Sequence, residues 1–236
     1  MRGSTNLRGR DLGPRAALVM ALIAAVMAGA LLLRAQSAPG QEITPLSAYS
    51  DPDWQEKAKK YHDRLARVQS GLSSKYRPDQ LKLFSSSESP TGGLGLWPNP
   101  VKFGASARYL CVFARVQVPP PTTGRAFPDT QSGRILTIMD AYGKNTISIL
   151  ARELETMPDP QLAGAAIIFI YSKKPLSDPA FDQSAEMLGL FMPRQSVITF
   201  AQLRMTIQTL FSQSEMLPLL QGQEQLNNFK LLVLQP

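Results

Sequence analysis

The sequence has 236 residues, 44% of them hydrophobic and 18% charged, with a single cysteine and a single histidine. This composition argues against a collagen-like, disordered or disulfide-framework protein. Only one stretch is apolar and long enough to cross a bilayer, so a polytopic membrane protein is excluded as well. We therefore expect one soluble domain behind one membrane anchor.

The formal net charge of +7 is concentrated near the start of the chain. Five arginines and one aspartate lie in the first 37 residues, so this segment carries +4 of the +7. The remaining +3 is too weak and too scattered for a nucleic-acid binder. We therefore expect no nucleic-acid partner.

Residues 16–33 form the predicted membrane span, because these eighteen residues carry no polar side chain. As a helix they would be about 27 Å long, close to the roughly 30 Å of a bilayer core. Four arginines precede the span and Arg34 follows it, which is typical of a signal-anchor. The small residues at 35–38 leave a second possibility, a signal peptide cleaved after Ser37.

Either mechanism exports the rest of the chain. The arginine asymmetry keeps the basic segment 1–15 in the cytoplasm. We expect a single-pass protein of a bacterial inner membrane, with its domain in the periplasm or at the cell surface, or a secreted protein if the leader is cleaved. A mitochondrial transit peptide fits less well, because the leader contains several glycines and a proline and has no amphipathic stripe.

Residues 34–50 are predicted to be a spacer and residues 51–70 an amphipathic helix. Asp51 is a suitable N-cap, and Pro52 suits the first helical position. The apolar residues recur every three or four positions, at Trp54, Ala58, Tyr61, Leu65 and Val68. This stripe predicts packing on the chain's own domain; a partner helix or the membrane surface is the alternative. If a partner binds here, we expect contacts by Trp54, Tyr61, Leu65 and Trp97.

Residues 71–107 are rich in Ser, Gly and Pro and are predicted to be a long, partly irregular connector. Trp97 and Phe103 lie in it, and a purely flexible linker would not need such side chains. We therefore expect the connector to lie over the domain.

Residues 108–236 are predicted to be the compact domain, an α/β fold in which flanking helices cover a mixed sheet. Short apolar runs predict strands at 109–118, which would be central, and at 135–139, 165–171 and 229–234. Helical periodicity appears at 147–154, at 181–188 after Asp178 and Pro179, and at 200–211 after Thr199, where Gln202 would complete a capping box.

Two segments leave an alternative fold open. Residues 201–211 also alternate between apolar and polar positions, as a strand does. Residues 142–145 could be a hairpin turn instead of the start of a helix. If both alternatives hold, the fold is α+β with a largely antiparallel sheet.

The sequence offers few groups for catalysis. His62 lies on the polar side of the predicted helix 51–70, and Cys111 lies within an apolar strand, so we expect an exposed imidazole and a buried, inert thiol. Glu153 and Glu155 are expected to be solvated. We therefore predict that the chain is not an enzyme and that it holds no metal or cofactor.

One group of residues suggests a ligand site. The predicted strand 134–140 ends near a predicted helix start, and the strand 165–171 ends in a Ser-Lys-Lys sequence. Strand ends, free helix amides and lysines together favour a small anion. The candidate binding residues are Asp140, Lys144, Asn145, Thr146, Ser172 and Lys173.

The leading functional hypothesis is a noncatalytic, membrane-tethered extracytoplasmic domain that acts as a structural or accessory subunit of an envelope protein assembly. Its expected partners are other envelope or membrane proteins, and the bilayer through residues 16–33. A binding module for a small anionic ligand is the first alternative, and an envelope enzyme of unknown type is the second.

Overall fold

The computed structural model describes residues 42–89, 92–98, 107–119, 127–175 and 185–219, all of which belong to one compact unit spanning Pro39–Pro236. Among these residues no helix has the length and apolarity that a membrane span requires. The predicted span 16–33 and the predicted strand 229–234 lie outside the described ranges.

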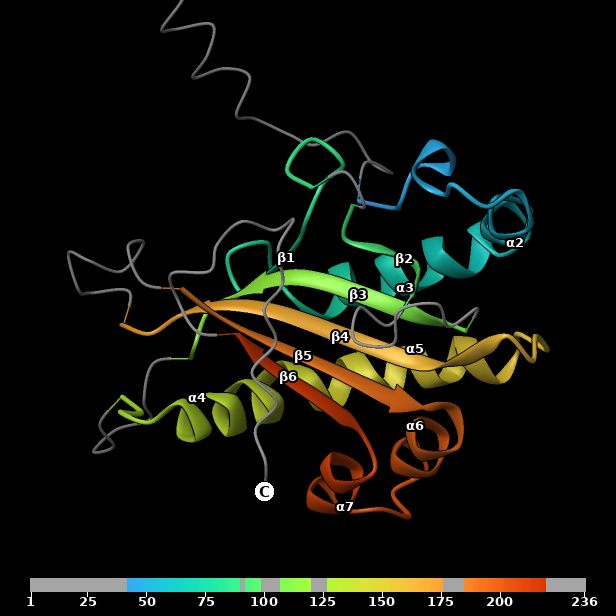
Figure 1. The fold of residues 1–236 in the computed structure, drawn as a ribbon. Helices are drawn as coiled ribbons and strands as arrows, with labels where there is room; N and C mark the ends of the chain where they lie inside the picture. The colour runs from blue at the N-terminus through green and yellow to red at the C-terminus, as the bar shows by residue number, and fades with distance from the viewer. Residues whose placement is uncertain (1–41, 90–91, 99–106, 120–126, 176–184, 220–236) are drawn as a thin grey trace, which may run out of the picture. The chain divides into compact units, whose positions relative to one another are not determined.

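The described residues form one six-stranded open sheet, in which five strands follow the order β1-β3-β4-β5-β6 and β2 also pairs with β3 (Figure 1). β3 and β4 are parallel, and every other pair is antiparallel. The strands are β1 (Leu81–Leu83), β2 (Leu94–Pro98), β3 (Arg108–Val116), β4 (Leu162–Ser172), β5 (Ala185–Pro193) and β6 (Glu215–Leu219).

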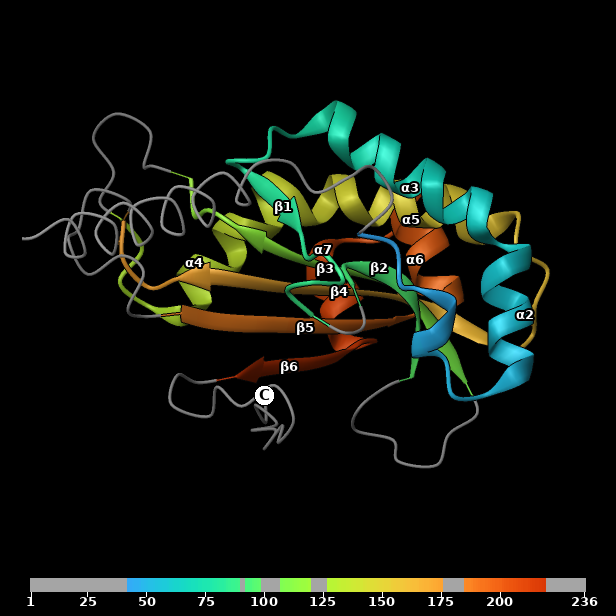
Figure 2. The ribbon, with the colours of Figure 1, turned by 90° about the horizontal axis from the view of Figure 1, so that it is seen from above.

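The helices flank this sheet, and α3 and α5 lie side by side along it in Figure 2. α4, the π-helical turn η2 and α5 form the crossover that makes the parallel β3–β4 pair possible. The helical segments are η1 (Leu46–Ala48), α2 (Pro52–Lys60), α3 (His62–Lys75), α4 (Gln131–Ile138), η2 (Met139–Gly143), α5 (Lys144–Glu155), α6 (Arg194–Ala201) and α7 (Ile207–Ser212).

The fold is therefore mixed α/β, with a mostly antiparallel open sheet and flanking helices. The predicted mixed sheet is present, but its parallel part is limited to β3 and β4. The remaining strand pairs are antiparallel, as the alternative fold predicted. The predicted strands at 109–118 and 165–171 are confirmed as β3 and β4, and β3 lies inside the sheet.

One side of the sheet carries the main core. Alternate residues of β3 and their register partners on β4 are fully buried, as Leu110 and Val112 are opposite Ala165 and Ile167. They pack with apolar side chains of α3 and α5, including Leu65 and Leu150. The helices therefore cover this side, because an apolar sheet face is stabilised when another element buries it.

The predicted helix 51–70 is confirmed and extends further, to Lys75. The Asp51 carboxylate accepts a hydrogen bond from the Asp53 amide at 3.0 Å, as an N-cap should. The helix breaks at Tyr61, which separates α2 from α3. All five residues of the predicted apolar stripe are buried in the chain's own core, so the helix packs on its own domain.

The predicted strand 135–139 is wrong, because these residues belong to α4 and η2. Thr130 caps the helix by accepting a hydrogen bond from the Gly133 amide at 3.1 Å. Ile135, Ile138 and Met139 are buried at helical spacing. The apolar run thus follows one side of a helix.

Residues 142–145 form neither a hairpin turn nor a separate helix start. Gly143, which precedes α5, has φ −61° and ψ −51°, so the helical backbone continues from η2 into α5. The extra residue of a π-helical turn is accommodated without a break. The predicted helix at 147–154 is confirmed as part of α5.

The C-terminal helix predictions are corrected in two places. Residues 185–188 begin strand β5, whose Leu188 and Leu190 face the core opposite Phe169 and Ile167. The remainder of the predicted helix 181–188 lies outside the described ranges. The predicted helix 200–211 is divided between α6 and α7, and Thr206, not Thr199, caps α7. The alternative strand at 201–211 is wrong.

The predicted connector 71–107 is more ordered than expected, since it contains the end of α3 and the strands β1 and β2. It does lie against the domain: Trp97 Nε1 donates a hydrogen bond to Thr44 Oγ1 at 3.0 Å. A Cβ atom at Gly95 would lie 2.1 Å from that oxygen, so this close approach requires glycine. Phe103 lies outside the described ranges.

Candidate functional site

A cavity of about 430 Å³ lies at the carboxyl ends of β3 and β4, the parallel pair of the described sheet. We call it the carboxyl-edge pocket. Open α/β sheets commonly bind ligands outside the carboxyl ends of their parallel strands. The side chains that define the pocket are Lys82, Arg115, Gln117, Ile170, Ser172 and Ala185.

Strand register sets the direction of the central pocket residues. Lys82 of β1 is the register partner of Arg115 on β3, and Arg115 is the partner of Ile170 on β4. The residues on either side of Arg115, Ala114 and Val116, face the helix-covered core. Because side chains alternate along a strand, the three pocket residues point away from the helices.

The pocket carries two cations directly opposite each other. Lys82 Nζ lies 2.8 Å from Glu88 Oε1, and the Arg115 guanidinium lies 5.6 Å from the centre of the Phe84 ring. Like charges directly opposite across two strands destabilise the pair. An anion between these two side chains would relieve that repulsion, so the local charge favours an anionic ligand.

Carboxylates only partly offset this positive charge. Asp79 also lines the pocket, but it is exposed and pairs with Arg77 at 3.2 Å. Burial acts to raise the pKa of Glu88, but hydrogen bonds from Lys82 and Ser85 outweigh it and hold the pKa below its ordinary value. Glu88 therefore stays ionised and holds Lys82, while the Arg115 guanidinium lies over the Phe84 ring.

A buried ion pair lies beside the pocket. Arg134 of α4 donates to both carboxylate oxygens of Glu186 on β5, at 2.9 and 2.7 Å. Its third nitrogen donates to the carbonyls of Pro128 and Asp129. The hydrogen bonds to Glu186 raise the pKa of Arg134. This network fixes the start of α4 against the start of β5, next to Ala185.

Tyr171 connects this ion pair to the pocket. It is the register partner of Glu186, and its side chain is 1% exposed. Its hydroxyl forms no hydrogen bond of normal geometry within the described structure, and neither does the buried Nε2 of Gln131. Burial, followed by the negative charge of Glu186, raises the pKa of Tyr171. The phenol therefore remains protonated next to the Glu186 carboxylate.

The structure divides the predicted ligand residues into two groups. Ser172 lies in the pocket, where its Oγ accepts a hydrogen bond from the Lys174 amide at 3.1 Å. Lys173 follows it and is half-buried. The remaining four residues belong to η2 and α5, because 134–140 is helical and the predicted free helix amides do not exist.

Those four residues have local roles. Asp140 and Lys144 are both exposed and form an ion pair one helical turn apart. Asn145 is half-buried, and Thr146 is fully buried, with no hydrogen-bond partner for its hydroxyl in the described structure. None of the four lines the carboxyl-edge pocket.

The predicted partner-contact residues have little free surface. Trp54, Tyr61 and Leu65 are buried in the chain's own core, and Trp97 is half-buried. His62 is exposed as predicted. Cys111 is fully buried, and burial raises the pKa of its thiol well above the ordinary value.

The prediction that Glu153 is solvated is wrong. Its carboxylate is buried beside α3, where Arg67 Nε lies 3.1 Å and Arg64 Nη1 lies 3.5 Å from Oε2. Nothing in the local sequence pairs Glu153 with these arginines, which lie more than 80 residues away along the chain. A salt link between α3 and α5 therefore emerges only from the fold.

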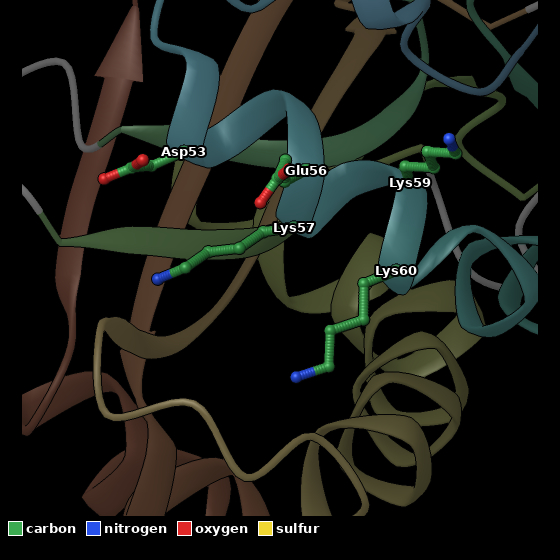
Figure 3. A pocket seen from close by; sticks show the side chains of 5 residues that line it. All are labelled: Asp53, Glu56, Lys57, Lys59 and Lys60. Atoms are coloured by element: carbon green, nitrogen blue, oxygen red, sulfur yellow. The ribbon is translucent and has the colours of Figure 1, made fainter.

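The polar side of α2 lines a second hollow, of about 520 Å³, formed by the charged residues Asp53, Glu56, Lys57, Lys59 and Lys60. Figure 3 shows Lys59 pointing away from the side on which Lys57 and Lys60 lie. Lys57 pairs with Asp159 at 3.1 Å and lies 4.5 Å from the centre of the Trp54 ring. Two acidic and three basic groups line this hollow together, so it has no clear ligand preference.

Sequence patterns did not identify Lys82, Arg115, Arg134 or Glu186 as part of a site. The one available signal was a charged residue inside or beside an apolar run, as at Arg134 and Glu186. No protein-family model matches the chain, and no curated protein or solved structure is significantly similar to it.

Proposed function

We propose that this chain is a noncatalytic binding domain whose carboxyl-edge pocket takes a small anionic ligand. The observation that supports this proposal is the position of Arg115 opposite Lys82, on the side of the sheet away from the helices and at the end of the parallel strands. Arginine binds carboxylate or phosphate oxygens with two parallel hydrogen bonds, which gives both affinity and orientation.

The rest of the pocket narrows the class of ligand. Ile170 and Ala185 supply apolar surface beside the cations. Gln117 and Ser172 add polar groups at the rim. An anionic group attached to a short apolar body would match both kinds of surface.

The ligand proposal is tested with two small probes of equal size and opposite charge, hexanoate and hexylammonium. We expect the full-length chain in mild detergent to bind hexanoate and not hexylammonium in calorimetry. Arg115→Gln should weaken hexanoate binding by roughly ten- to 150-fold, since a hydrogen bond to a charged group contributes about 1.5–3 kcal/mol. Lys82→Gln should weaken it less, because Glu88 already holds that lysine.

Lys144→Gln is the matched control, since it removes an exposed cation that pairs with Asp140 outside the pocket. Hexanoate affinity should not change in this variant. Equal binding of the two probes, or equal losses in the Arg115 and Lys144 variants, would remove the proposal.

We propose further that the domain works outside the cytoplasm, tethered through residues 16–33, as an accessory or structural subunit of an envelope assembly. The apolar span and its flanking arginines support this setting. Leu203, in the turn between α6 and α7, is exposed to solvent, which supports a contact with another protein. Size-exclusion chromatography in mild detergent tests the proposal. The chain should elute together with partner proteins, and elution as a single chain would contradict the proposal.

A further inference from the structure

Leu203, between α6 and α7, combines two unfavourable features. Its φ is +58°, and it is the one non-glycine residue with positive φ among the described residues. Its side chain is 93% exposed. A bulky residue rarely adopts this backbone conformation, and an exposed leucine gains nothing from packing within its own chain.

The backbone around Leu203 explains the conformation but not the choice of residue. The Leu203 amide donates to the Phe200 carbonyl at 2.9 Å, and the Arg204 amide donates to the Thr199 carbonyl at 3.1 Å. These two bonds form the Schellman motif that ends α6, in which the left-handed position is usually glycine. Leucine at this position therefore strains the isolated domain.

The surroundings of Leu203 resemble the centre of a small protein interface. Gln202, Arg204 and Thr206 are exposed polar residues around it. Met205 and Ile207 are half-buried and pack on the core, so they support the turn from beneath. An apolar side chain surrounded by a polar rim is the general layout of a protein interface.

We propose that Leu203 is the anchor of a protein–protein contact and inserts into an apolar pocket, rimmed by acidic residues, on a different protein of the assembly. Arg204 supplies the charge that such a rim would match. A second copy of this chain fits less well, because a symmetric contact at Leu203 would bring Arg204 close to its own copy. A bilayer also fits less well, because one leucine buries too little surface for stable attachment.

The full-length chain tests the contact with stability and assembly measured together. Leu203→Gly should raise the Tm by about 2–4 °C, since it relieves the left-handed strain. The same variant should no longer form the proposed complex in size-exclusion chromatography. Arg204→Glu should weaken the complex without that gain in Tm. A fall in Tm, or an intact complex, in the glycine variant would overturn the proposal.

Leu136 provides the matched control, because it is an exposed leucine on a different element, α4, with 50% of its surface accessible. Leu136→Ala should leave the complex intact, and its loss in this variant would count against a specific contact. A photo-crosslinking residue at 203 should join the chain to apolar residues of a different protein, and this adduct should disappear with Arg204→Glu. Adducts to lipid or to a second copy would overturn the proposal.

This inference rests on the proposed assembly role, but the two fail differently. If the wild-type chain migrates alone, both proposals are removed. If a complex forms and survives Leu203→Gly, only the contact at Leu203 is removed. Arg115→Gln should leave the complex unchanged, which separates this surface from the carboxyl-edge pocket; loss of the complex in that variant would contradict a contact centred on Leu203.

Discussion

Two salt links join distant parts of this chain in opposite surroundings. Arg134 and Glu186 are 6% and 4% exposed, and they meet through two hydrogen bonds. Glu153 is buried as well, but its partners Arg64 and Arg67 keep 35% and 49% of their side chains exposed. In the first pair both charged groups are shielded from solvent, whereas in the second only the carboxylate is.

This difference in burial predicts which ion pair contributes more to the free energy of unfolding. A charge inside the protein loses its hydration, so removal of its partner leaves a strongly unfavourable group. A half-exposed arginine can return to water when its partner is removed. The Arg134–Glu186 pair should therefore fix α4 against β5, whereas the Glu153 cluster should add a modest amount to the α3–α5 contact.

The largest effect is expected from Arg134→Met, which leaves the Glu186 carboxylate buried and unpaired. We expect a loss of about 3–5 kcal/mol in the free energy of unfolding, measured by urea denaturation. The double variant Arg134→Met with Glu186→Leu should recover much of that loss, because it also removes the orphan charge. A loss under about 1 kcal/mol in the single variant would show that the pair is hydrated.

A smaller effect is expected from Glu153→Gln. The amide can still accept one hydrogen bond, and both arginines are free to reach solvent, so we expect a loss of about 1 kcal/mol in urea denaturation. Asp79→Asn is the control, because its pair with Arg77 is exposed on both sides and should contribute almost nothing. If Glu153→Gln costs as much as Arg134→Met, the two links do not differ as described.

The smallest effect is expected from Arg67→Gln, because Arg64 still pairs with the Glu153 carboxylate; we expect a loss of about 0.2–1 kcal/mol at low salt. Dissolved ions screen exposed charges, so the difference from the wild type should shrink in 1 M salt, where the Debye length is about 3 Å. The cost of Arg134→Met should be nearly the same at both salt concentrations. A cost of Arg67→Gln that does not depend on salt would place that arginine in a drier setting than its exposure indicates.

Sequence patterns were sufficient where one physical signal dominated. The helix α2–α3 has a cap, a first-turn proline and an apolar stripe, and all three indicate the same element. β3 and β4 are apolar on both sides, as interior strands are. In these elements local propensity and tertiary burial agree.

The same patterns failed where composition and periodicity disagreed. The run at 135–139 is rich in branched residues, which favour strands, but its buried positions continue at helical spacing into Tyr142 and Ile147. Residues 185–188 had a helical spacing that the pairing of β5 with β4 overrode. The error at 135–139 also displaced the predicted ligand site.

Of that site only Ser172 lies in the carboxyl-edge pocket, because the pocket depends on strand register. Lys82 and Arg115 are 33 residues apart, and Arg134 and Glu186 are 52 residues apart. Only sheet pairing and the α4 crossover bring each pair together. No local sequence window contains that information.

The burial of Cys111 gives this chain an intrinsic reporter. Its sulfur lies near the centre of β3, and the thiolate that attacks alkylating reagents is scarce because burial raises the pKa. Iodoacetamide can reach it only after the middle of the sheet has separated. Because the sequence contains no other cysteine, the rate of mass gain would time that separation in the unmodified chain, with no engineered label.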